Sequence, residues 1–432
     1  MVGNGYVKLV WHAHKLCVLS TGLIFGSCLA VLSARCVQAA EESFWAQPSM
    51  IGAPSGLKDS LQEIGIDLSV TYTAFYQGLV GGEGDKDWEF GGKTDVIGNF
   101  SGEKLGLWKG LYINAHAEFV NGGNVLNAGD GSILPVNTAL AFPTLGGQDD
   151  DLSLFVTQVF SSSVSLSAGK FNMLDAAAKT PLIGGGGLTT FFNTALAAPI
   201  SGVTPPYLLG GILSYKTKPA IYTLMVYDPR NAQDEDVIKH PFEKGVTTSL
   251  SVTFPVTIGG KRGYQNFRGA YSTLDGTDFR DIPDLILPGG DGEVGTIDGY
   301  WFASYSFQQY LVEDSSNPKR GWGLFGQAAI SDGNPNPFGW SGFIGLGGTG
   351  LFAERPDDGF GIAYFYQGFS DDLKQSLDDV NVDLKDESGI EAYYNMAVTP
   401  WLNLTADGQV IWPGDGDETA YFLGLRAQLK AF

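Results

Sequence analysis

Few side chains in this sequence are arranged for catalysis or for holding a metal ion. All three cysteines precede residue 40, and only two histidines follow it, His116 and His240. A zinc site built from thiolate and imidazole therefore lacks ligands. No G-x-S-x-G nucleophile turn occurs in the sequence. Residues 345–350 fit G-x-G-x-x-G, but the residues after them lack the helix pattern that a dinucleotide site requires. We expect no enzyme activity, no cofactor and no metal site.

Charged side chains instead recur in segments where polar and apolar residues alternate. Successive side chains of a strand point to opposite faces, so these charges share a face with Ser, Thr, Asn and Gln. A base facing lipid at mid-depth would cost about 2 to 4 kcal/mol, so this face should meet water. We interpret most of these residues as solvated wall positions. The set is Asp67, Glu89, Lys93, Asp95, His116, Glu118, Arg268, Glu391, Asp407 and Arg426.

A subset of this polar face is suited to contact a polar solute. Hydrogen-bonding groups would replace water around the solute, and aromatic faces would cover its C–H surfaces; several weak contacts suit passage better than one tight site. The candidates for polar contact are Lys93, Asp95, His116, Glu118 and Arg268. The candidates for aromatic stacking on the same face are Tyr112, Phe171 and Phe325.

The element that must carry these residues is a strand. Ile66 to Gln77 places six apolar residues on one face and mainly polar residues on the other, and 246–254, 390–398 and 421–429 repeat the pattern. Further strands are expected around Asp95, Asn114, Thr157, Ser167, Ile212, Leu224, Arg268, Ser304, Phe325, Ile344, Phe365 and Thr405. Short and long connections alternate between them. Residues 66–432 therefore predict an all-β fold, an antiparallel transmembrane β-barrel of about 16 strands.

Composition separates this barrel from its rival, a soluble β-sandwich. Charged residues make up only 17% of the chain while 44% is hydrophobic, and the polar faces carry hydroxyls and amides rather than Lys and Glu. A lipid-facing surface explains why so little surface charge is needed. Tyrosine and tryptophan near strand ends, such as Tyr72, Tyr76, Trp340 and Trp401, are typical of an aromatic girdle.

Residues 1–40 are expected to be a secretory signal. A basic start is followed by the uncharged stretch 16–32 and by small residues at 37–40. Removing this segment takes away three bases and no acid, which changes the formal net charge from -21 to -24. A chain this acidic is unsuited to nucleic acid. Residues 41–65 should form a linker and a short helix near Ser55–Gly65.

The long uncharged interval Leu182–Pro199 is the candidate constriction loop. It is rich in Gly, and it carries Phe191, Phe192 and Asn193. We expect it to fold into the barrel, because its aromatic residues would otherwise be exposed. The alternative is an exterior loop that covers the mouth.

Several stretches in their order along the chain resemble the OprB-type carbohydrate-selective porin family. They include LQEIGIDLSVTYTAFYQG at 61–78, VSLSAGKFNMLD at 164–175, FFNTALAAP at 191–199 and YYNMAVTPWLNLTADGQVIWPGDGD at 393–417. The resemblance covers residues 55–432. It implies a 16-stranded barrel in the bacterial outer membrane that admits sugars to the periplasm, with a constriction built partly from an infolded loop and no catalysis.

We therefore expect a passive porin for mono- or small oligosaccharides. The alternatives are a general or cation-preferring porin and a secreted β-sandwich that binds sugars. Expected partners are sugars in transit, outer-membrane lipid and the barrel assembly machinery; a homo-oligomer is open. The sugar, the pore radius and the charge selectivity do not follow from the sequence. Neither does the position of Phe432, which is out of phase with the apolar face of 421–429.

Overall fold

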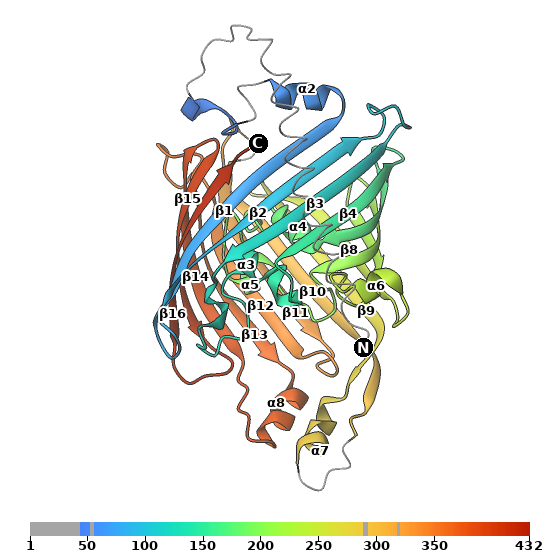
Figure 1. Ribbon diagram of the computed structural model, residues 1–432, viewed down its shortest axis with the longest axis vertical. Coiled ribbons are helices and arrows are strands. Elements are labelled where there is room, and N and C mark those ends of the chain that lie inside the picture. Colours follow the sequence, from blue (N-terminus) through green and yellow to red (C-terminus); the bar gives the residue numbers. More distant parts are fainter. Residues whose placement is uncertain (1–43, 52–55, 288–292, 318–319) are drawn as a thin grey trace, which may run out of the picture.

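The chain folds into a closed antiparallel barrel. The computed structural model describes residues 44–51, 56–287, 293–317 and 320–432. In these ranges sixteen strands pair each with the next, and the last pairs with the first (Figure 1). The predicted fold class is confirmed. The expected signal segment, residues 1–40, and Ser55 lie outside the described residues.

The strands of the first half are β1 Ile66–Gly81, β2 Trp88–Ser101, β3 Leu111–Gly122, β4 Asp150–Val159, β5 Val164–Asn172, β6 Tyr207–Lys216, β7 Ile221–Tyr227 and β8 Thr247–Ile258. Those of the second half are β9 Lys261–Thr277, β10 Thr296–Glu313, β11 Gly321–Ser331, β12 Phe338–Thr349, β13 Gly359–Phe369, β14 Glu387–Thr399, β15 Leu402–Trp412 and β16 Ala420–Lys430. Each strand includes the residue on which the sequence pattern centred it.

Helices are short and lie in the connections. They are η2 Phe44–Ala46, α2 Leu57–Glu63, η3 Val125–Asn127, α3 Thr138–Ala141, η4 Thr144–Gly146, α4 Met173–Ala178, α5 Thr194–Ala197, α6 Glu235–Lys239, η5 Phe279–Asp281, α7 Ile282–Ile286 and α8 Asp371–Asp378. Within the described ranges, no helix has the length and apolarity to cross a membrane.

The two faces of the sheet differ as the alternation predicts. In β1, Phe75 is 1% exposed whereas its neighbour Tyr76 is 44% exposed, and in β16 Arg426 is 2% exposed whereas Leu425 is 56% exposed. Apolar residues therefore cover the outer wall, and the charged and polar parity points inward. This arrangement requires that the outer face meets hydrocarbon.

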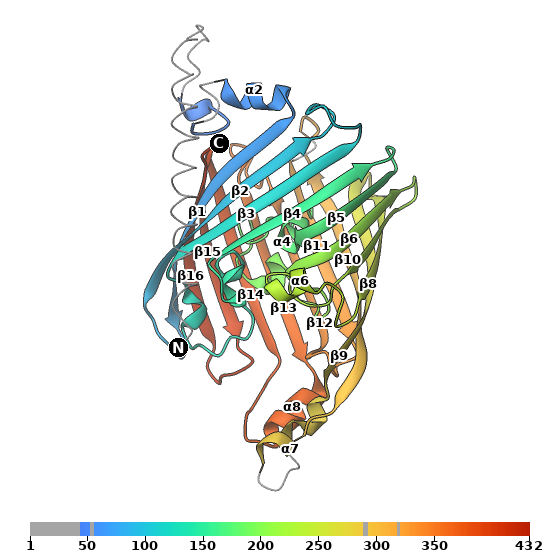
Figure 2. The same cartoon turned by 45° about the vertical axis from the view of Figure 1, so that its right-hand side comes forward.

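The connections also differ between the two ends of the barrel. One end, which holds both termini of the sheet, has short turns such as Gly259–Gly260, whose positive φ angles of 59° and 76° suit glycine. The other end has the long connections, and α7 and α8 project beyond the barrel there (Figure 2). We call these the short-turn end and the long-loop end.

The segment 44–51 meets the C-terminal residues at the short-turn end. The backbone N–H of Met50 and of Ile51 donate to the carbonyls of Lys430 and Ala431, and the ring of Trp45 stacks on Trp401 at 5.6 Å. Phe432 lies past β16, and its backbone exchanges hydrogen bonds with Val70 of β1. The terminal residue is thus out of the strand but still fixed to the sheet.

Two long connections fold inside the barrel, as was predicted for one of them. We call residues 123–149 the first inner segment and residues 173–206 the second inner segment. The second contacts inward residues of β1, β3, β11 and β14, which lie around the whole wall. A segment that touches all of these strands must cross the interior.

Candidate permeation site

A buried group of charges on β2 and β3 fixes both inner segments to the wall. This charged group consists of Lys93, Asp95, His116 and Glu118. The Nζ atom of Lys93 lies 2.5 Å from Glu118 and 3.9 Å from Asp95, and Nε2 of His116 lies 3.0 Å from Asp95. Opposite charges on adjacent strands thus satisfy one another, which is what makes their burial tolerable.

The charged group also contacts residues beyond β2 and β3. Lys93 donates a hydrogen bond to the carbonyl of Phe142 in the first inner segment at 3.2 Å. His116 Nδ1 lies 3.0 Å from Asp175 of α4, and Asn172 donates to Glu118 at 2.8 Å. The four residues do point inward as expected, but they are at most 6% exposed. They hold the inner segments and do not line open water, which corrects their assignment as solute contacts.

These groups do not need a metal ion. Donor atoms of Asp95, His116 and Glu118 lie within 4.8 Å of one another, a spacing that a cation could use. The ammonium of Lys93 already provides the positive charge beside Glu118, and both nitrogens of His116 lie against carboxylates.

A second buried anchor on β14 to β16 holds the tip of the second inner segment. The carboxylate of Glu391 accepts hydrogen bonds from the backbone N–H groups of Phe192 and Asn193, the latter at 3.0 Å. Nη1 of Arg426 donates to the carbonyls of Gly187 and Thr190 at 2.8 and 2.9 Å. Charge-assisted bonds of this kind are about twice as strong as neutral ones. The wall therefore fixes the backbone of the tip from both its donor and its acceptor sides.

The first inner segment has its own anchors on the same wall. The carboxylate of Glu387 accepts from the backbone N–H groups of Ile133 and Leu134. The amides of Gln77 and Gln409 both donate to the carbonyl of Val136. Both inner segments are thus held by inward-facing side chains of the barrel strands.

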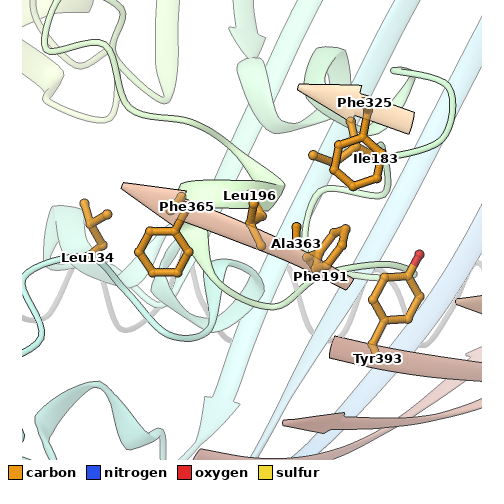
Figure 3. Close-up of a cluster of buried hydrophobic side chains, with 9 residues drawn as sticks. Leu134, Ile183, Phe191, Leu196, Phe325, Ala363, Phe365 and Tyr393 are labelled. Carbon is orange, nitrogen blue, oxygen red and sulfur yellow. The ribbon is translucent and has the colours of Figure 1, made fainter. Parts of the chain in front are cut away.

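Aromatic residues of the inner segment pack against aromatic residues of the barrel. The ring of Phe191 lies edge-on to Phe325 at 5.9 Å and to Tyr393 at 4.8 Å (Figure 3). The ring of Phe192 lies edge-on to Phe75 at 5.5 Å. Phe191, Phe192 and Asn193 are completely buried. The predicted infolding is observed, and its residues attach the segment.

Burial also changes the assignment of two predicted stacking surfaces. Phe325 is 0% exposed beneath the second inner segment, and Phe171 is packed with Leu208, Met225 and Tyr227. Neither ring can face a passing solute in this structure. Of the three aromatic candidates, Tyr112 alone is exposed, at 42%. Tyr112 lies near the short-turn end of β3, and it does not line the gap between the second inner segment and β10 to β12 that is described below.

Arg268 faces the interior and contacts the returning part of the second inner segment. Its Nε donates to Ser249 at 3.1 Å and its Nη2 to the hydroxyl of Thr204 at 2.5 Å. The hydroxyl of Thr204 also lies 2.9 Å from that of Tyr227. Arg268 is only partly buried. The structure therefore keeps it as an inward-facing candidate and separates it from the charged group on β2 and β3.

A gap remains between the second inner segment and the wall formed by β10 to β12. It has a volume of about 120 Å³. Its lining residues are Ala177, Thr180, Ile183, Leu196, Ala197, Pro199, Ser306, Phe307, Gln308, Phe325, Gly326, Gln327 and Phe343. This lining includes hydroxyls, amides and apolar groups but no charged side chain. We call it the uncharged gap.

One oxygen in this gap has no partner. The side-chain oxygen Oε1 of Gln308 is buried and accepts no hydrogen bond from the described part of the chain. A buried acceptor without a donor costs about 1 to 3 kcal/mol. A solute hydroxyl entering the gap could therefore be bound there.

Sequence reasoning missed the first inner segment, although a signal was present. The pentapeptide Asn-Thr-Ala-Leu-Ala occurs at 137–141 and again at 193–197, and Pro follows each copy two residues later. Each copy forms a one-turn helix, α3 or α5, capped by its Asn side chain. Since 193–197 lies in the predicted infolded loop, the repeat indicated a second segment with the same environment.

A closed sixteen-strand antiparallel barrel with an apolar outer wall and a partly filled interior is the architecture of an outer-membrane porin. The family model described as "Carbohydrate-selective porin, OprB family" matches residues 103–430, and the chain belongs to this family. It is thus a carbohydrate-selective porin of the bacterial outer membrane, as the resemblance implied.

Solved structures show the same fold at low sequence identity. The high-pH structure of OprB from Pseudomonas putida is 20% identical, with a TM-score of 0.78, and the match covers 90% of this chain and 100% of that one. The low-pH structure is 16% identical, with a TM-score of 0.51, and covers 89% and 99%. None of the curated proteins compared with this chain is significantly similar to it.

Proposed function

We propose that small neutral sugars cross this porin through the uncharged gap. The observation that carries the proposal is its lining, in which Ser306, Gln308 and Gln327 of the wall face Ile183 and Leu196 of the inner segment. Amides and hydroxyls can exchange hydrogen bonds with sugar hydroxyls, while apolar groups meet the C–H faces. Such contacts are weak and numerous, which suits passage.

The same lining argues against a role in selecting ions. A charge-selective constriction is normally built from rings of charged side chains. Here the inward charges of β2, β3, β14 and β16 are used to hold the inner segments. We propose that flux follows the sugar gradient without chemical turnover, and that the acidic loops influence ions only at the mouth.

The test is sugar block of single-channel current in planar bilayers. Glucose, maltose and maltotriose should reduce the current through the native porin. Gln308→Leu combined with Gln327→Leu should weaken this block at least tenfold, because two hydrogen-bonding groups are lost. Asn99→Leu changes an exposed, inward-facing amide on β2 outside the gap and should leave block unchanged. Absence of block by any sugar would favour a general or cation-preferring pore.

We further propose that residues 1–40 are removed on export and that the barrel assembly machinery inserts the remaining chain. The basic start, apolar stretch and small residues of this segment support the first statement. The N-terminal sequence of the porin isolated from outer membranes tests it, and an intact residue 1 would contradict it. The mass of the native complex decides between a monomer and a homo-oligomer.

A further inference from the structure

The outer wall carries a long apolar groove over β8 to β11. A hollow of about 660 Å³ is lined by Leu250, Phe267, Gly269, Ala303, Ala328 and Ile330. A second hollow of about 550 Å³ adjoins it, since both are lined by Phe267 and Tyr305, and it continues past Val256. Leu250, Phe267 and Ile330 are exposed, so the groove is on the outside of the barrel.

Small residues form the floor of this groove, and large ones form its sides. Gly269 pairs with Leu250 on β8 and with Ala303 on β10, and no atom lies within 4 Å of where a Cβ on Gly269 would be. The polar side chains of Tyr305 and Gln265 in the groove bond to each other, because the hydroxyl of Tyr305 donates to the side-chain oxygen of Gln265. The surface is therefore concave and apolar.

The position of the groove identifies what fills it. The outer wall faces hydrocarbon, and the short-turn end of a bacterial outer-membrane barrel faces the periplasm. Tyr271 and Trp301 pair with each other on the long-loop side of the groove. At the other side, Lys261 shares the outward parity of Gln265 and Phe267 and begins β9 at the short turn.

The distance from the far end of the groove at Gly269 to Lys261, which lies four residues beyond the lining residue Gln265, corresponds to one leaflet. From Gly269 to Lys261 is eight residues, or about 26 Å along the strand. A tilt of about 40° reduces this to roughly 20 Å along the membrane normal. Half of a bilayer with its headgroups is also about 20 Å thick. A phospholipid therefore has the length to reach from Gly269 to Lys261, and Lys261 makes no ion pair with any described residue.

We propose that this groove binds one phospholipid of the periplasmic leaflet, with an acyl chain over Gly269 and the phosphate beside Lys261. Dispersion contacts with the floor and sides hold the chain. The positive charge of Lys261 attracts the phosphate. This site is independent of the sugar path, because it lies on the opposite face of the same strands.

Native mass spectrometry tests the proposal on the full porin reconstituted with phosphatidylglycerol and phosphatidylethanolamine and then transferred to mild detergent. The native porin should retain one phospholipid. Gly269→Leu fills the floor and should lower the retained fraction at least tenfold; Ala303→Leu serves as a second filling variant if the first fails to assemble. Lys261→Gln should weaken retention about fivefold, the equivalent of one charge near a phosphate.

The matched control is Gly408→Leu. Gly408 is an outward-facing glycine of β15 with room for a side chain, and this change should leave retention at the native level. Native porin without a bound phospholipid, or equal retention by Gly269→Leu, would overturn the proposal. So would a change in the number of copies in the complex as the main effect of Gly269→Leu, because the groove would then be an interface between copies.

Discussion

The side-chain hydroxyls of Thr138 and Thr194 lie 3.1 Å apart inside the barrel, at equivalent positions of the two Asn-Thr-Ala-Leu-Ala copies. The backbone N–H of Thr138 donates to the carbonyl of Phe192, and that of Thr194 donates to the carbonyl of Pro135. Each copy thus bonds to the residues that precede the other. The two inner segments are joined to each other as well as to the wall.

The first prediction concerns this junction. Thr194→Val should loosen it by about 1 kcal/mol, because a buried hydroxyl bond is lost, and Thr138→Val should loosen it more, because the hydroxyl of Thr138 also donates to the carbonyl of Phe192 at 2.7 Å. The double variant should lose less than the sum, since both changes remove the same contact. Hydrogen exchange of residues 137–141 and 193–197 measures the effect. Thr253→Val, on the inward face of β8, is the control; strictly additive losses would show that the hydroxyls do not interact.

A second prediction concerns the tip of the second inner segment. Glu391→Gln removes the charge that receives the N–H groups of Phe192 and Asn193, and we expect a loss of about 1 to 3 kcal/mol in attachment of the tip. Single-channel conductance should become larger and noisier while the barrel still assembles. Asp67→Asn changes an exposed carboxylate of β1 and should have no effect. Unaltered conductance of Glu391→Gln would mean that aromatic packing alone holds the tip.

The third prediction tests whether the hydrogen bonds of Arg268 or its positive charge alone affects sugar uptake. Arg268→Ala removes the bonds to Ser249 and Thr204 and should alter sugar uptake without preventing assembly. Arg268→Lys keeps the charge but cannot reproduce both bonds, so it should resemble the alanine variant. Liposome swelling with a graded sugar series measures uptake. Native behaviour of the lysine variant would show that charge alone matters there.

The fourth prediction concerns pH at the long-loop end. Hydrogen bonds from Arg280 first, and from Asn334 at 2.8 Å, hold the pKa of Asp278 below its usual range. A lowered pKa means that this contact is present at neutral pH and is lost only as pH falls below the ordinary Asp value of about 3.9. Hydrogen exchange of 278–282, corrected for its intrinsic rate, should therefore be constant from pH 7 to 4. Loss of protection near pH 5, or its persistence in Asp278→Asn at every pH, would contradict this.

The barrel was predictable because its constraint is local. Each side chain from Ile66 to Gln77 faces either lipid or the barrel interior, so apolar and polar residues alternate in the sequence itself. The parity of Lys93, Arg268 and Arg426 followed from the same rule. Infolding of 182–199 was predictable because Phe191 and Phe192 had no other place to be buried.

The alternation predicts whether a side chain faces inward or outward, but it does not predict which other residues cover that side chain. Glu118 and Arg268 have the same pattern in the sequence, yet Glu118 is completely buried under Asn172 and Tyr207 whereas Arg268 is partly open. The difference depends on contacts between segments far apart in the chain. For the same reason Phe325 and Phe171 looked like exposed rings, and Gln308 and Gln327 were not singled out.

The distance along the chain between Phe192 and its anchor has a consequence for biogenesis. Glu391 follows Phe192 by 199 positions, and Arg426 follows Gly187 by 239. The second inner segment therefore precedes by about 200 residues the strands that hold its tip, and the seam between β1 and β16 cannot close until the final residues are present. A chain truncated before β14 would keep the residues that line the uncharged gap but would lack both the closing seam and the Glu391 and Arg426 anchors of the second inner segment.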